Sequence, residues 1–95
     1  MYISLTTSQV TPKESAEVAK FLNDFLPKMR KQPGVIAIYH FDRPDKSDEY
    51  TIVIWKDGES LTAYREGELI KEAIAFEQKH GLKSMREAYP TKIAL

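Results

Sequence analysis

The chain has no cysteine, so disulfide bridges, thiolate nucleophiles and cysteine metal sites are all excluded. It also lacks an excess of charge of one sign, because 14 basic side chains balance 14 acidic ones. A balanced charge gives no field that attracts a phosphate backbone or an anionic lipid surface, so we expect neither nucleic acid nor membrane as a partner. No apolar run approaches the ~20 residues of a membrane span, and residues 1–10 do not have the pattern of a signal peptide. These absences predict a cytoplasmic protein.

The composition that remains is that of an ordinary globular domain. Hydrophobic residues make up 42% of the 95 residues and charged residues 29%. A chain of this length forms one core, so we expect a single domain over residues 1–95.

The first half of the chain predicts a strand followed by a helix. Residues 1–7 alternate in the manner of a strand. The run from Thr11 to Glu14 has a capping threonine, then a proline, then a glutamate three residues after the cap, which predicts a helix start at Thr11. Apolar residues then recur at three- and four-residue steps as far as Met29. Pro27 lies inside this pattern, where we expect a kink or a broken last turn.

The second half predicts a hairpin, two helical segments and a final strand. Residues 35–41 and 50–56 are rich in β-branched and aromatic side chains, and the polar residues 42–49 form a long loop between them. Asp57 can cap a short helix that Gly67 interrupts, and a second helical run covers residues 68–80. Gly81 ends this run in a left-handed position. Residues 82–89 are ambiguous, and residues 91–95 are expected to form the last strand.

This order predicts an α+β fold of the ferredoxin-like βαββαβ type. Right-handed crossovers place the helices on one face of a four-stranded antiparallel sheet. The middle strands nevertheless carry apolar side chains on both faces, and a soluble monomer rarely exposes so large an apolar surface. We therefore expect a homodimer packed through the sheet face. The alternative is that residues 82–89 fold back as a lid over that face.

The segments around the hairpin resemble those of a known family. Pro33-Gly34-Val35 precedes the charged hairpin, and Tyr50-Thr51-Ile52-Val53-Ile54-Trp55-Lys56 is followed by Glu59-Ser60-Leu61-Thr62-Ala63-Tyr64. This arrangement resembles the antibiotic biosynthesis monooxygenase family of dimeric α/β barrels. The resemblance implies that fold and a homodimer. The family includes oxygenases that use no cofactor and oxidise reduced polycyclic aromatics, enzymes that degrade haem, and members of unknown activity.

The haem-degrading branch is a poor match. Its pattern requires an asparagine on the first strand, a tryptophan in the short helix and a histidine ligand in the next helix. The corresponding positions here hold Thr6, Tyr64 and Ile74. Isoleucine cannot bind iron, so haem is disfavoured and we expect no cofactor.

Oxygenation without a cofactor needs a dry pocket, a proton acceptor and aromatic walls. His40 is the candidate base and Tyr64 the candidate hydroxyl donor, so both are candidate catalytic residues. Tyr39, Trp55, Ser4 and Thr6 are the candidate substrate-binding residues, and for Tyr39 this depends on which sheet face it occupies. Each has a structural alternative: His40 can end a strand bonded to backbone or water, the two tyrosines and Trp55 can be core, and Ser4 and Thr6 can be ordinary hydroxyls.

Other polar residues are interpreted as structural. Asp45, Asp48 and Glu49 match no calcium loop and are expected to form a solvated turn, so we predict no metal site. Two functions are favoured about equally: a monooxygenase acting on a small aromatic or quinone-like substrate, and a non-catalytic dimeric module of the same fold that binds a small molecule or serves in assembly. An isomerase or decomposition enzyme on the same barrel is a third, less favoured alternative. A closed apolar cavity of roughly 300 Å³ or more with His40 or Tyr64 at its wall would favour the enzyme.

Overall fold

Four strands and three α-helices follow one another along the chain. The structure is a computed structural model that describes residues 1–95, apart from the side chain of Pro44. The elements are β1 (Tyr2–Gln9), α1 (Ser15–Arg30), β2 (Val35–Arg43), a 3-10 turn η1 (Pro44–Lys46), β3 (Asp48–Trp55), α2 (Gly58–Glu66), α3 (Leu69–Lys79) and β4 (Ser84–Pro90).

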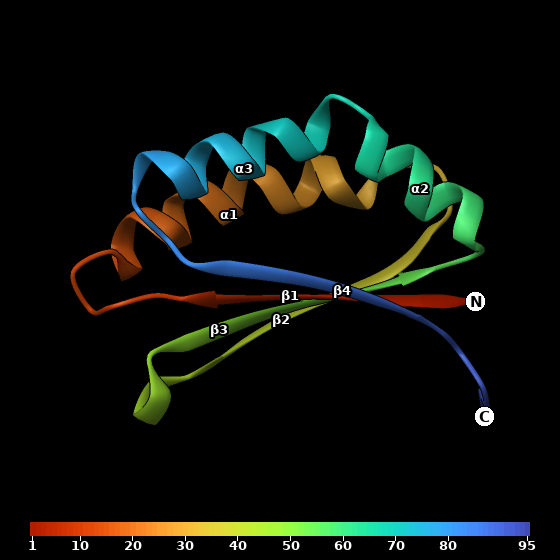
Figure 1. Cartoon of the computed structure of the whole chain (residues 1–95), viewed down its shortest axis with the longest axis horizontal. Coiled ribbons are helices and arrows are strands. Elements are labelled where there is room, and N and C mark those ends of the chain that lie inside the picture. The colour runs from red at the N-terminus through yellow and green to blue at the C-terminus, as the bar shows by residue number, and fades with distance from the viewer.

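The strands form one antiparallel sheet in the order β2-β3-β1-β4. All three helices lie on the same side of this sheet, and the opposite side carries no helix (Figure 1). This arrangement follows from two right-handed crossovers, the first through α1 and the second through α2 and α3. The predicted ferredoxin-like βαββαβ fold is therefore confirmed.

The start of α1 differs from the prediction. Thr11 does not cap the helix, because the chain from Thr11 to Glu14 forms a separate turn in which the Glu14 N–H donates to the Thr11 carbonyl over 3.0 Å. The helix begins at Ser15, and its N-cap residue Glu14 makes no side-chain capping bond. The last turn of α1 is also not broken at Pro27, since the helix continues to Arg30. A proline removes one hydrogen bond, and the burial of Met29 in the core holds the turn that follows.

The last strand is β4, and the prediction of a strand at residues 91–95 was wrong. β4 pairs with β1 from Ser8 opposite Ser84 to Tyr2 opposite Pro90. The alternative of a lid was also wrong, because the ambiguous segment lies within the sheet as an edge strand. Arg86 and Glu87 interrupt the apolar alternation that marks a strand, whereas pairing with β1 needs only the backbone.

The hairpin of β2 and β3 is longer than predicted, and its loop is shorter. Asp42 pairs with Glu49 and Arg43 with Asp48, so only residues 44–47 remain between the strands. A bulge between Val35 and Ala37 also shifts the register. One residue is inserted, so Val35 shares the helix-facing side with Ile38 instead of lying with Ala37, as strict alternation would require.

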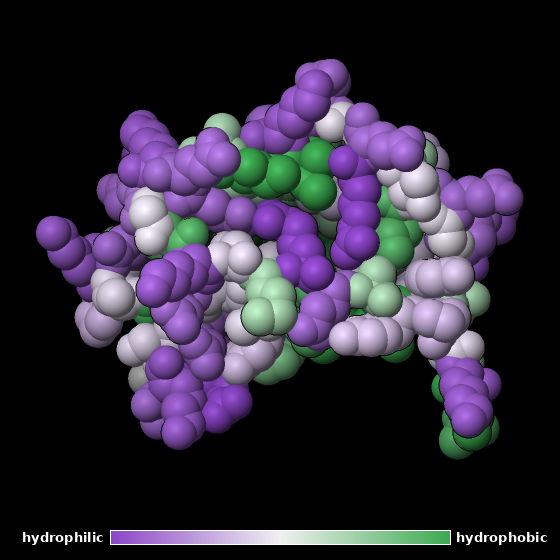
Figure 2. All heavy atoms as spheres, in the orientation of Figure 1, coloured by the Kyte–Doolittle hydropathy of each residue, from purple (hydrophilic) through white to green (hydrophobic). Residues whose placement is uncertain are grey.

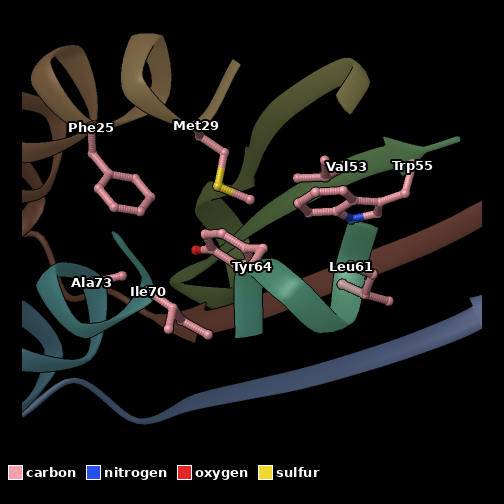
Figure 3. Packing of buried hydrophobic residues seen from close by; sticks show 8 residues of the cluster. All are labelled: Phe25, Met29, Val53, Trp55, Leu61, Tyr64, Ile70 and Ala73. Atoms are coloured by element: carbon pink, nitrogen blue, oxygen red, sulfur yellow. The ribbon is translucent and has the colours of Figure 1, made fainter. Parts of the chain in front are cut away.

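The core lies between the helices and the sheet (Figure 3). Its members are Phe25, Met29, Val53, Trp55, Leu61, Tyr64, Ile70 and Ala73. Trp55 is fully buried, and its indole N–H donates to the Ser4 hydroxyl over 2.9 Å. A buried tryptophan needs such a partner, which explains the polar Ser4 on the inner face of β1.

Two glycines are required by the backbone around the helices. The Asp57 side chain accepts a hydrogen bond from the Ser60 N–H over 2.8 Å, which confirms the predicted cap of α2. Gly34 lies directly against this first turn, with φ of 84°, and a methyl group there would overlap the Ser60 side chain. Gly81 follows α3 with φ of 64°, as predicted, and has open space around it.

The side of the sheet without helices carries large exposed side chains. The exposed fraction is 60% for Tyr39, 46% for Phe41, 60% for Met85 and 56% for Tyr89. All four alternate with residues that face the helices, so they lie on the open side. We call this surface the open face. It confirms the prediction that the middle strands are apolar on both sides.

The C-terminal residues leave the sheet after β4. They project below it, on the side away from the helices (Figures 1 and 2). Ile93 and Leu95 are highly exposed there. No helix in the described chain has the length and apolar character needed to cross a bilayer.

Candidate functional site

A cavity of about 80 Å³ lies between the helices and the sheet and is partly open to solvent. Side chains from all three helices and all four strands line it. It is smaller than the roughly 300 Å³ at the lower end of drug-sized ligand sites, so a ring-sized ligand requires some of its walls to move. Both His40 and Tyr64 line it, although the volume named above as favouring an enzyme is not reached.

The sheet side of the cavity is polar. His40, Thr51, Thr6 and Arg86 are cross-strand neighbours in one row that runs over β2, β3, β1 and β4. The next row on the same face contains Glu49, Ser8 and Ser84, and the Ser8 and Ser84 hydroxyls are 2.8 Å apart. We call these two rows the polar floor.

The helix side of the cavity is aromatic and apolar. The Phe21 ring stacks on Phe76 with centroids 4.2 Å apart and on Phe25 with centroids 5.1 Å apart. Leu61 and Tyr64 of α2 complete this wall. A ligand inside the cavity would therefore meet flat apolar surfaces on one side and hydrogen-bonding groups on the other.

Both ring nitrogens of His40 have partners on β3. Nδ1 lies 2.8 Å from the Thr51 hydroxyl oxygen, and Nε2 lies 2.8 Å from Oε1 of Glu49. The side chains of His40 and Glu49 are 24% and 17% exposed. His40 is therefore an imidazole held between a carboxylate and a hydroxyl, with its side chain partly exposed on the edge strand β2.

Tyr64 lies in the core with its hydroxyl directed toward Phe25 and Ala73 (Figure 3). Burial raises the pKa of Tyr64 from 10.0 to about 12, because the phenolate is poorly solvated there. Glu77 raises the pKa further, while Arg86 and Arg65 oppose that rise. The phenol is therefore a hydrogen-bond donor at neutral pH and not a base.

The raised pKa of Tyr64 predicts a late ionisation step. The folded state favours the neutral phenol, so the stability that this group contributes is complete below pH 10 and is lost as the pH rises through about 12. In a titration followed by tyrosinate absorbance, the native chain should show a step near pH 12 that Tyr64→Phe lacks. If Tyr64→Phe instead lost a step near pH 10, the Tyr64 hydroxyl would be hydrated in the native chain and the prediction would be wrong.

An ion pair joins α3 to β4 at the cavity wall. Arg86 donates through two nitrogens to the two carboxylate oxygens of Glu77, over 2.9 and 2.6 Å. Their side chains are 23% and 15% exposed, and both line the cavity. This bidentate pair closes the side of the cavity between the last helix and the last strand.

The structure brings four of the six candidate residues together. His40, Tyr64, Ser4 and Thr6 line the cavity. Trp55 lies behind Ser4 and does not line it, and Tyr39 points to the open face. The roles assigned to these residues stay predictions.

Sequence reasoning missed the residues that complete the polar floor. The prediction of a solvated turn is wrong for Asp48 and Glu49, because both lie in β3, and Glu49 lines the cavity. Thr51 was not singled out, although the pairing of the two hairpin strands places it opposite His40. Arg86 fell in the ambiguous segment. Among the residues that the structure describes, no group of three or more His, Asp or Glu side chains could hold a metal ion.

Comparison with solved structures shows the same fold in several proteins. A protein from Deinococcus radiodurans, described as a candidate antibiotic biosynthesis monooxygenase, superposes with a TM-score of 0.90 at 14% identity over 100% of this chain and 96% of its own. SnoaB of Streptomyces nogalater, described as a cofactor-independent oxygenase, gives a TM-score of 0.76 at 16% identity. The match covers 99% of this chain and 96% of SnoaB. A conserved protein from Methanosarcina mazei gives a TM-score of 0.79 at 17% identity, and the match covers 97% of this chain and 94% of that protein. Identities this low establish the fold alone.

Comparison at the level of sequence identifies the family. No curated protein matched the chain. The family model named "Antibiotic biosynthesis monooxygenase" matches residues 1–75, which cover β1 to most of α3. The chain therefore belongs to the antibiotic biosynthesis monooxygenase family.

Proposed function

We propose that the chain is a cofactor-independent monooxygenase that acts on a small aromatic or quinol-like substrate bound between the sheet and the helices. The observation that carries this proposal is the cavity itself, which combines an aromatic wall with a polar floor containing His40. Membership of the family supports the reaction class, and the apolar wall supports the substrate class.

The reaction needs a proton acceptor because the substrate supplies the electrons. Removal of a proton from a substrate hydroxyl gives an electron-rich oxyanion that can reduce dioxygen. A ring carbon of the substrate that carries two hydrogens then becomes a carbonyl. Its two C–H bonds break, one atom of dioxygen enters the product, and the other leaves as water with those two hydrogens. His40 is the acceptor in this proposal, and the Tyr64 hydroxyl donates to a substrate oxygen. The apolar wall keeps bulk water away from the oxyanion.

Oxygen consumption tests this function directly. The purified chain should accelerate oxygen uptake by at least some members of a panel of hydroquinones and reduced polycyclic aromatics, above the rate of autoxidation. The rate should not change after treatment with a metal chelator. Uptake at the autoxidation rate for the whole panel would refute the proposal.

The small cavity favours a second candidate function. A volume of about 80 Å³ leaves little room for a substrate, which suits a non-catalytic module whose interior is filled by its own side chains. A module of this kind would show neither oxygen uptake nor saturable quenching of tryptophan fluorescence by the same panel.

We propose that the chain works as a homodimer packed through the open face. Exposed Tyr39, Phe41, Met85 and Tyr89 form an apolar surface that spans the sheet from β2 to β4. The Phe41 and Tyr50 rings stack across the strands with centroids 5.0 Å apart, which gives this surface a flat aromatic area. A second copy presents the same surface, so a symmetric sheet-to-sheet contact covers both.

A charge on the open face should separate the two copies. Ile52 lies on the central strand β3 and faces this side, so Ile52→Glu would place a carboxylate in the contact. We expect light scattering at micromolar concentration to give the mass of two chains for the native protein and of one chain for Ile52→Glu. The matched control is Ile74→Glu, because Ile74 is an exposed isoleucine of α3 and should leave the dimer intact. A native monomer would refute the proposal.

A further inference from the structure

Three side chains form a continuous hydrogen-bonded chain at the edge of the cavity. Glu49 and Thr51 are two residues apart on β3 and point to the same face, and His40 on β2 lies opposite Thr51. The imidazole bridges the two, with Nε2 at 2.8 Å from the Glu49 carboxylate and Nδ1 at 2.8 Å from the Thr51 hydroxyl.

Chemistry fixes the direction of each hydrogen bond when the ring is neutral. A carboxylate only accepts, so the bond to Glu49 requires the proton on Nε2. Nδ1 of the neutral ring then carries a lone pair and accepts the hydrogen of the Thr51 hydroxyl. The Thr51 oxygen keeps its own lone pairs, which can accept a proton from a ligand in the cavity.

Neither nitrogen of His40 is available to a substrate while these bonds hold. A substrate hydroxyl that approached Nδ1 directly would have to displace Thr51, and one that approached Nε2 would have to displace Glu49. Thr51 also lines the cavity beside Thr6 in the same row of the sheet. The atom presented to the ligand is therefore the Thr51 oxygen and not an imidazole nitrogen.

We propose that Thr51, His40 and Glu49 act together as a proton relay, in which Thr51 is the group that touches the substrate. The inference rests on the proposed function insofar as the cavity is the substrate site. The substrate hydroxyl gives its proton to the Thr51 oxygen, and Thr51 gives its own proton to Nδ1 of His40. The products are a substrate oxyanion, an unchanged threonine and an imidazolium whose charge the Glu49 carboxylate balances.

Glu49 is a positioning residue in this relay. It holds the neutral ring in the tautomer that leaves Nδ1 without a proton, and it stabilises the imidazolium once the proton has arrived. The other charged groups that face the cavity are Arg65, Glu77 and Arg86. Glu77 and Arg86 form their own ion pair, so Glu49 is the carboxylate that serves His40.

The tautomer of His40 can be measured without any substrate. Nitrogen NMR of the native chain, at a pH where the His40 ring is neutral, should show the ring proton on Nε2. Glu49→Gln should shift the ring toward a mixture of tautomers, because an amide can donate as well as accept. His80, the second histidine, provides an internal reference that should not change. A native ring with its proton on Nδ1 would overturn the relay.

Proton transfer can be measured with a phenol that reports its own ionisation. We would bind 4-nitrophenol and follow phenolate absorbance against pH. The relay should lower the ionisation midpoint of the bound probe by about one pH unit relative to free probe, a tenfold gain of phenolate. Thr51→Val and His40→Gln should abolish the shift, and Thr51→Ser should restore it because the hydroxyl returns.

The matched control is Thr62→Val, the same substitution at an exposed position of α2 that does not line the cavity. An unshifted midpoint in the native chain, or an equal loss of shift in Thr51→Val and Thr62→Val, would overturn the inference. These results are independent of oxygen uptake. A shifted ionisation midpoint of the probe without oxygen consumption would refute the monooxygenase and support the relay. Oxygen consumption with an unshifted midpoint would support the monooxygenase and refute the relay.

Discussion

Replacement of His40 by alanine is expected to lower the rate of oxygen uptake by about 10²- to 10⁴-fold, the usual contribution of a positioned general base. In the proposed mechanism the imidazole receives the proton that the substrate must lose, and His40 is the one imidazole among the described residues that line the cavity. The oxyanion would then form only by release of the proton to water, in a cavity with an apolar wall. The measurement is the initial rate of oxygen consumption at saturating hydroquinone, so that weaker binding does not contribute.

The matched control for this prediction is His80→Ala. His80 follows α3, packs against Phe76 with the rings tilted and their centroids 4.3 Å apart, and is absent from the cavity wall. Removal of the His80 side chain should change the rate of oxygen uptake by no more than a few-fold. Equal rates for the native chain and His40→Ala would clear His40 of any part in the reaction. Thermal unfolding of both variants would separate a lost base from a lost fold.

The Gly34→Ala substitution is expected to destabilise the fold strongly. At φ of 84° an L-residue adds roughly 1–2 kcal/mol of backbone strain. The new methyl group would also overlap the Ser60 side chain, whose short stem cannot move away without the first turn of α2, and such overpacking costs about 1–3 kcal/mol more. The sum is about 2–5 kcal/mol, which for a domain of this size lowers the midpoint of thermal unfolding by roughly 8–40 °C.

Gly81→Ala separates the two contributions to that loss. Gly81 has φ of 64°, but no atom lies within 4 Å of the position that a methyl group would take. Only the backbone strain remains, so the expected cost is about 1–2 kcal/mol. Both variants must be melted at the same protein concentration, because a dimer makes the midpoint depend on concentration. Equal losses of stability in Gly34→Ala and Gly81→Ala would mean that the Ser60 side chain moves away from the new methyl group at no cost.

The fold was predictable where local pattern and tertiary packing agree. The β-branched hairpin, the capped helix at Asp57 and the left-handed Gly81 are each set by residues close in sequence, and each was confirmed. Prediction failed where the chain had two local options. Thr11 can cap a helix or begin a turn, and the structure uses the turn. β4 was missed because an edge strand needs only a partner backbone, which no periodicity in its own sequence reveals.

The candidate site was predictable in part for the same reason. His40 is conspicuous as a lone histidine on an apolar strand, and Tyr64 as an aromatic residue near the end of a short helix. Glu49 and Thr51 are ordinary strand residues in the sequence, and only the register of the hairpin places them beside the imidazole. Tyr39 could not be assigned to a face from the sequence, because a bulge between Val35 and Ala37 changes the alternation along β2. Register over several strands is a tertiary property.

The two sides of the cavity are held together in different ways, and this has a consequence for specificity. Hydrogen-bonded ladders fix the spacing of the polar floor, whereas the helices above are attached mainly through side-chain packing. Exchanging Phe21 or Phe76 for a smaller apolar residue should therefore enlarge the space for a ligand while the proton-handling groups keep their positions. Relatives with this architecture could diversify their ligands through helix substitutions alone.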